Sequence, residues 1–342
     1  MMSSNHDSND LHERYVRHRD AGVFIAASED ELDIDDSHHA LLYDRSLDNV
    51  TGQSSSMIRR AGPLHALNYA NLCAYSLGAS GVAVAFYKHI EGNTLESVIH
   101  DLYPTLVTPS NYAHAIWCAI LFFQGIFTIV QLTPTYRSHA LVRHMHYWYL
   151  GTTIFQTWWI LFAVWECMAL SLLCLCAAWV CLFQITDAQN RAVLPNAALY
   201  LEFQAFKFPF TLHYGWITCM LLLSVNMLGV YWEWDTNDLL MTAILTFGVL
   251  SVVGYHDLVF SGHHYDTNFV VLIVVVHYFV AMGVELHDLD PKNEVANIYD
   301  HYVVLAFEKA SFWAVGMIVA VALPNLISAY IRRHFVIEVV EH

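Results

Sequence analysis

Residues 112–133 read YAHAIWCAILFFQGIFTIVQLT, and no aspartate, glutamate, lysine or arginine interrupts them. A helix needs about 20 apolar residues to cross the roughly 30 Å of hydrocarbon in a bilayer, so this stretch has the composition and length of a membrane span. Lipid offers no hydrogen bonds to the backbone, and a long unbroken apolar run satisfies its own as a helix, whereas the strands of a membrane barrel alternate over about 10 residues. The stretch therefore predicts a helical membrane protein.

Seven further stretches are of similar length and almost free of charge. The eight predicted spans lie near residues 64–88, 112–133, 147–165, 167–186, 208–232, 239–256, 268–285 and 311–331. Of all residues, 56% are hydrophobic and only 13% are charged, about half the usual charged share of a soluble domain, which fits burial against lipid. We expect an all-α membrane protein that folds as an eight-transmembrane-helix bundle. Its expected partner is the lipid bilayer in which it is embedded.

Basic residues near the span ends predict the orientation of the bundle. With a cytosolic N-terminus, the inner face holds eight of them and the outer face three: Arg59, Arg60, Arg137, Arg143, Arg191, Lys207, Arg332 and Arg333 against Lys88, Lys292 and Lys309. Lysine and arginine are enriched in cytoplasmic loops, so both termini are predicted on the cytosolic side. The even number of spans agrees with this orientation.

The acidic residues lie mostly in the first 60 residues and in the loops that flank the spans. Residues 1–60 are rich in serine, asparagine, aspartate and glutamate and lack an apolar face long enough to offset the entropy of ordering, which predicts a disordered tail. We interpret the net charge of -16 as solvation of the tail and loops, and we expect no nucleic-acid partner.

A second pattern lies across the start of the second span. Residues 108–125 read TPSNYAHAIWCAILFFQG, in which Pro109, Trp117 and Gly125 are spaced eight residues apart. Proline is tolerated in the first turn of a helix, and an indole about two turns deeper gains both apolar contact and a hydrogen bond. The glycine then permits the close approach of a neighbouring helix.

This stretch resembles the second transmembrane helix of the translocator protein or tryptophan-rich sensory protein family (TspO/MBR), where proline, tryptophan and glycine have the same spacing. Two other segments are similar to the third and fifth helices of that family: FQTWWILFAVWE at residues 155–166, with Gln156, Trp158 and Trp159, and PFTLHYGWITCMLLLSVN at residues 209–226, with Pro209, Trp216 and Asn226.

The resemblance covers about residues 64–232 and implies the domain organisation. We expect a tail at residues 1–60, a five-helix TspO-like core at 61–235, three additional transmembrane helices at 236–333, and a C-terminal tail at 334–342.

The resemblance also implies a function. Such a protein binds a tetrapyrrole, a sterol-like lipid or another hydrophobic small molecule in a pocket between its helices, in a sensory or transport role. The implied walls are Trp117, Trp159 and Trp216, and the candidate polar contacts are His114, His213, Gln156 and Asn226. Indoles with a few polar groups suit a flat hydrophobic ligand such as a porphyrin or haem-like molecule, although packing between helices is the commoner use of such side chains.

A histidine-rich membrane metalloenzyme of the desaturase or hydroxylase type is an alternative. Two groups of histidines flank the predicted inner face: His139, His144 and His146 after the second span, and His256, His263 and His264 after the sixth. Imidazole suits iron, and the spacing of His139 and His144 matches the first histidine box of those enzymes. The repeated paired box that they also require is absent from this sequence.

A non-catalytic accessory subunit of a membrane complex is a third alternative. No acid or lysine lies in the middle of a predicted span, so nothing marks an ion pathway. A homodimer or a larger membrane complex remains open as a partner.

Overall fold

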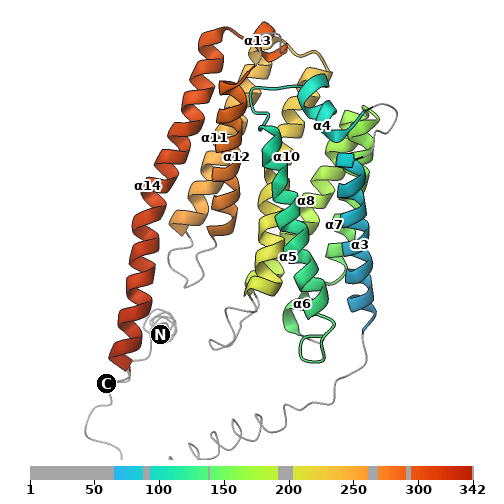
Figure 1. Ribbon diagram of the computed structural model, residues 1–342, viewed down its shortest axis with the longest axis vertical. Coiled ribbons are helices and arrows are strands. Elements are labelled where there is room, and N and C mark those ends of the chain that lie inside the picture. The colour runs from blue at the N-terminus through green and yellow to red at the C-terminus, as the bar shows by residue number, and fades with distance from the viewer. Residues whose placement is uncertain are drawn as a thin grey trace, which may run out of the picture. The chain divides into compact units, whose positions relative to one another are not determined.

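The computed structural model describes residues 65–87, 93–137, 139–191, 203–260, 269–289 and 294–340, all within the unit Ala61–His342. These residues form long helices that run side by side (Figure 1). The tail predicted at residues 1–60 lies outside the described residues. Its disorder stays a prediction.

Helices occupy all eight positions at which spans are predicted. They are α3 (Ala66–Tyr87), α5 (Ile116–Val130), α7 (Trp148–Val164), α8 (Met168–Arg191), α10 (Phe208–Tyr231), α11 (Thr236–Phe260), α12 (Phe269–His287) and α14 (His301–Val340). Short helical segments lie between them: α4 (Leu95–Ser97), the π-helix η1 (Val98–Leu102), the 3-10 helix η2 (Asn111–Ala115), α6 (Ala140–His144), the π-helix η4 (Phe203–Lys207) and α13 (Glu294–Ile298). The last helix continues through most of the range 334–342 that was expected to be a tail.

The all-helical class is confirmed, whereas the count of eight spans is not. Six helical segments among the described residues are long and apolar enough to cross a membrane: 111–130, 168–191, 204–231, 236–255, 269–287 and 301–324. Neither α3 nor α7 is among them. At 17 residues α7 is short for a span, and α3 buries the amides Asn68 and Asn71.

The NH2 groups of both α3 amides donate to Gln131 at the end of α5. Asn71 Nδ2 donates to Gln131 Oε1 at 2.8 Å, and Asn68 Nδ2 donates to the carbonyl of Gln131 at 3.3 Å. Unpaired amides are costly away from water, so these bonds hold α3 against α5.

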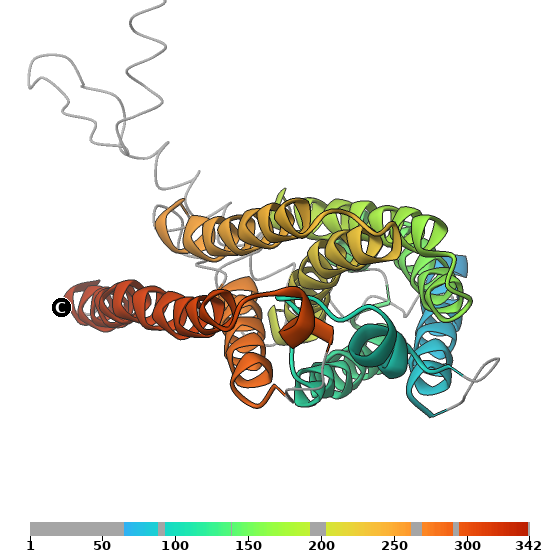
Figure 2. The same cartoon turned by 90° about the horizontal axis from the view of Figure 1, so that it is seen from above.

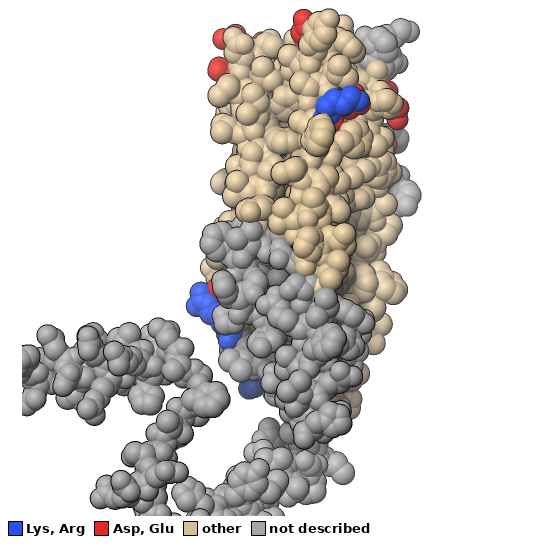
Figure 3. Space-filling view, turned by 90° about the vertical axis from the view of Figure 1, so that its left-hand side faces the viewer, with Lys and Arg blue, Asp and Glu red and all other residues tan. Residues whose placement is uncertain are grey.

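The surface of the bundle is apolar, as expected of helices that face lipid. Large hydrophobic side chains such as Phe122, Ile129, Leu245 and Trp313 are exposed. Figure 3 shows a broad uncharged zone between charged side chains near the two ends of the visible face. In water this surface would promote aggregation, whereas in a bilayer it is matched to its solvent.

Helix α10 is the centre of the arrangement (Figure 2) and packs against α5, α8, α11 and α12. Residues 215–220 are consecutive and all buried, and six residues cover more than a full helical turn. A helix that is apolar and buried all round belongs to the interior of a bundle. A polar side chain on α10 must therefore find its partner inside the bundle, on the backbone of α10 itself, on a neighbouring helix or in a ligand.

Residues 93–110, here called the cap, connect α3 to the second span and cross one end of the bundle. The cap is anchored on α12, because Ser110 N donates to the carbonyl of Ala281 at 3.1 Å and Tyr278 Oη donates to the carbonyl of Val107 at 2.7 Å. The cap contains two short helical segments, α4 and η1.

Close packing between α3 and α7 depends on a glycine. A Cβ atom added to Gly78 would lie 3.1 Å from Thr153 Cγ2, whereas one added to Gly248 of α11 would meet nothing within 4 Å. Small residues let membrane helices approach closely, and Gly78 has this role between α3 and α7.

We predict that Gly78→Leu destabilises the bundle by about 1–3 kcal/mol, because the new side chain forces α3 away from α7. Gly248→Leu is the matched control and should leave stability within experimental error. The measurement is thermal unfolding of both purified variants in detergent. Equal melting of the two variants would contradict the proposed packing.

Candidate functional site

Four of the seven predicted ligand contacts meet where α5 packs against α10. The His114 ring lies 5.8 Å from the Trp216 ring at 89°, and the Trp117 ring lies 5.5 Å from the His213 ring at 72°. Each pair joins an imidazole to an indole, edge to face, which is a favourable aromatic geometry. We call these four residues the imidazole–indole quartet, and all four are buried.

A hydrogen-bond chain fixes the orientation of His213. Tyr149 Oη donates to Gln124 Oε1 at 3.2 Å, and Gln124 Nε2 lies 3.0 Å from His213 Nδ1. The amide nitrogen can only donate, so His213 Nδ1 accepts, and the proton of the neutral ring is carried by Nε2. Tyr149 is not among the site residues predicted from the sequence.

Three predicted site residues present buried polar atoms that make no hydrogen bond to any described residue. These atoms are His213 Nε2, Trp216 Nε1 and Gln156 Oε1. Buried polar groups are nearly always paired, and each exception calls for an explanation such as a water or a ligand. These three predicted site residues thus offer two donors and one acceptor.

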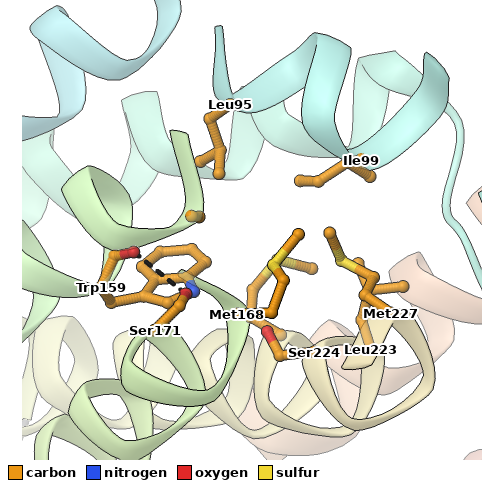
Figure 4. Close-up of a pocket in the computed structure, with 10 residues that line it drawn as sticks. Leu95, Ile99, Trp159, Met168, Ser171, Leu223, Ser224 and Met227 are labelled. Carbon is orange, nitrogen blue, oxygen red and sulfur yellow. Dashed lines mark hydrogen bonds between the residues drawn. The ribbon is translucent and has the colours of Figure 1, made fainter. Parts of the chain in front are cut away.

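An apolar pocket lies beneath the cap (Figure 4). Its lining comes from the cap, α7, α8 and α10, and consists of Leu95, Ile99, Trp159, Ala163, Met168, Ser171, Met220, Leu223, Ser224 and Met227. Ser171 Oγ donates to the carbonyl of Trp159 at 3.1 Å. The enclosed space is about 10 Å³, enough for roughly one water molecule.

The pocket and the quartet share one face of α10. Residues 213, 216, 220, 223 and 227 follow the three- and four-residue spacing of a single helical face. Tyr149 contacts Phe210 and Trp159 lines the pocket with Met220, so α7 and α10 keep the same register along this face. Gln156 lies on α7 between Tyr149 and Trp159 and is buried.

Of the three predicted tryptophan walls, only Trp159 lines the pocket. Trp117 and Trp216 belong to the quartet, which also borders the cap, because the His114 ring lies 6.3 Å from the ring of the cap residue His100. The methionines and cap residues of the lining were missed, although Met220 and Met227 are spaced seven residues apart and could have been recognised as two turns of one face.

The cap is held at the turn between α7 and α8 by Glu166, whose backbone has a φ of 58°. This backbone conformation favours glycine, but the glutamate side chain at this position makes hydrogen bonds to the cap. It accepts hydrogen bonds from Tyr103 Oη at 3.0 Å and Asn93 Nδ2 at 3.2 Å. Burial and the bond to Glu166 raise the pKa of Tyr103 to about 12, so Tyr103 keeps the proton that it donates throughout the physiological range.

Asn226 is engaged in packing between helices. Its Nδ2 donates to Thr246 Oγ1 of α11 at 2.7 Å and to the carbonyl of Leu222 at 2.8 Å. The interhelical use of this amide, anticipated from the sequence as the commoner one, is thus present in the structure. A contact between Asn226 and a ligand stays a prediction.

The histidines of the metalloenzyme alternative are only partly described. His139 caps α6 by accepting from Leu141 N at 3.3 Å, and its ring stacks on Phe206. His144 and His146 are exposed. The side chain of His256 and all of His263 and His264 lie outside the described residues, and within the described part of the chain no three potential ligands gather as a metal site.

The helices, the lipid-facing surface and the interior aromatic site define a multi-pass helical membrane protein. The model of the family described as TSPO-like protein matches residues 68–308, well over half of the 342 residues. The chain belongs to this family. The match continues beyond the three motif-bearing segments, through α11 and α12 and into α14. Comparisons with curated proteins and with solved structures gave no match.

We predict that Asn226→Ala and Thr246→Val each lower stability by about 0.6–2 kcal/mol, the range for hydrogen bonds between membrane helices. The double variant should be little worse than either single variant, because both changes remove the same bond. Thermal unfolding of the four proteins measures the coupling. Fully additive losses would show that the bond does not stabilise the α10–α11 contact.

Proposed function

We propose that this protein binds a hydrophobic small molecule, a tetrapyrrole or a sterol-like lipid, between α5, α7 and α10 in a sensory or transport role. The observation that carries the proposal is the set of unpartnered polar atoms on His213, Trp216 and Gln156. They lie on α7 and α10, two of the helices that line the apolar pocket, and an apolar pocket with a few convergent polar groups is the usual form of a small-molecule site.

The composition of the pocket favours a ligand that is mostly apolar. Methionines at positions 168, 220 and 227 supply flexible, polarizable surface that adapts to different shapes. Trp159 adds a flat aromatic face. Serines 171 and 224 are the polar members of the lining, and Ser171 already donates to a carbonyl.

Ligand entry requires the site to widen, because a space of about 10 Å³ is far below the roughly 300 Å³ of a typical small-molecule pocket. The cap is the element whose movement would widen it, since Leu95 and Ile99 form one wall (Figure 4). Polar side chains hold the cap to the bundle, through Glu166 and through His100, whose Nδ1 lies 3.3 Å from Glu285 Oε1.

We further propose that α3 and α7 complete a bundle of eight spans with both termini on the cytosolic side. Residues 165–167 form a tight turn that joins α7 to α8, and α7 packs along both α8 and α3. Helix α8 has the length and composition of a span, so α7 beside it would traverse most of the same thickness.

The test is quenching of tryptophan fluorescence by protoporphyrin IX in detergent-solubilised protein. We expect saturable quenching, and we expect Trp159→Phe to weaken the affinity about three- to tenfold, because the smaller ring loses aromatic contact.

Trp158→Phe is the matched control, since Trp158 is adjacent in sequence but 44% exposed on the surface of the bundle. This variant should keep the wild-type affinity. Quenching that never saturates, or equal effects of the two substitutions, would contradict binding in the interior.

A further inference from the structure

We propose that His213 and Trp216 form a paired donor site that selects an uncharged ligand bearing a carbonyl oxygen. This inference rests on the proposed function and specifies the chemical class of the ligand. It concerns the polar end of the molecule, whose apolar body would extend toward the pocket under the cap.

The two donors belong to one face of α10. They are three residues apart and so project side by side. The bond from Gln124 leaves the proton of neutral His213 on Nε2, and an indole nitrogen is always a donor. Both N–H groups lack an acceptor among the described residues, and both side chains are at most 1% exposed.

Two neighbouring side-chain oxygen atoms take part in hydrogen bonds with other groups. Gln124 Oε1 accepts from Tyr149, and Tyr278 Oη, whose ring lies 6.2 Å from the Trp216 ring, donates to the carbonyl of Val107. Two buried donors without acceptors are costly. An acceptor oxygen brought by a ligand would satisfy them, and a hydrocarbon would not.

The surroundings favour a neutral oxygen over a carboxylate. The rings in contact with the two donors belong to Trp117, His114, His277 and Tyr278, and none of these side chains carries a permanent charge. Burying a carboxylate without a cation costs far more than burying a carbonyl group. A ketone, ester or amide oxygen is therefore the expected acceptor.

The experiment compares three probes with one carbon skeleton: 5β-cholane, 5β-cholanic acid and its methyl ester. Binding to the full-length protein in detergent is measured from the rise in melting temperature with probe concentration. We expect the ester to bind about tenfold more tightly than the hydrocarbon, as expected for one or two neutral hydrogen bonds, and more tightly than the acid above the pKa of the carboxyl group.

The variant Trp216→Phe should reduce the preference for ester over hydrocarbon about fivefold while the hydrocarbon affinity changes little. Trp179→Phe is the matched control, because the Trp179 indole already donates to Thr218 Oγ1 at 3.0 Å. It should keep the full preference even if its melting temperature falls. A loss of affinity in Trp216→Phe that is equal for ester and hydrocarbon would assign Trp216 to packing and overturn the inference.

The wild-type protein alone separates the two proposals. If ester and hydrocarbon stabilise it equally, the donors are satisfied in another way, for example by a bound water, and the inference is overturned while interior binding stands. If the acid binds best, the neutral-ligand inference is wrong. If none of the three probes stabilises the protein but porphyrin quenching saturates, the inference fails and the proposed function survives. If neither probe type binds, the proposed function fails as well.

Discussion

The structure depends on the enclosure of α10 by four other helices. A helix in this position has neither water nor lipid headgroups beside it, so each polar side chain that it carries must be paired from within the bundle. Asparagine 226 meets this requirement through Thr246, and His213 meets half of it through Gln124. The remaining N–H groups of His213 and Trp216 have no hydrogen-bond acceptor among the described residues. Both lie on one face of α10, which is therefore the face proposed to bind a ligand.

The same constraint separates the parts of the molecule that serve stability from the part that serves binding. Between α3 and α5, the amides of Asn68, Asn71 and Gln131 exchange hydrogen bonds and act as an interhelical clamp. At the cap, Tyr103 and Asn93 satisfy Glu166. The unpaired groups of His213 and Trp216 lie on α10, which also supplies Met220, Leu223, Ser224 and Met227 to the pocket under the cap.

Much of this fold could be predicted from the sequence because lipid imposes simple rules. Long apolar runs gave helices at all eight expected positions, and the Pro109, Trp117 and Gly125 pattern pointed to the family that the chain belongs to. The count of eight spans was not confirmed, because α3 and α7 are not among the six described helices that are long and apolar enough to cross a membrane. The division into a five-helix core and three added helices stays a prediction.

The site was predictable as a set of residues but not as an arrangement. Indoles and imidazoles on the second and fifth spans could be identified, yet nothing in their spacing indicates that His114 meets Trp216 and Trp117 meets His213. The cap could not be foreseen either, because its position results from contacts of Glu166, Glu285 and Tyr278, which lie far from it in sequence.

The central claim is that the tryptophan and histidine side chains of α5, α7 and α10 enclose a binding site in the interior of the bundle. Photocrosslinking with a diazirine analogue of protoporphyrin IX dimethyl ester, followed by peptide mapping, tests it most directly. The account predicts competable adducts on residues 114–117, 156–171 and 213–227. Adducts confined to lipid-facing residues such as Phe122, Leu245 and Trp313, with none on those segments, would contradict it.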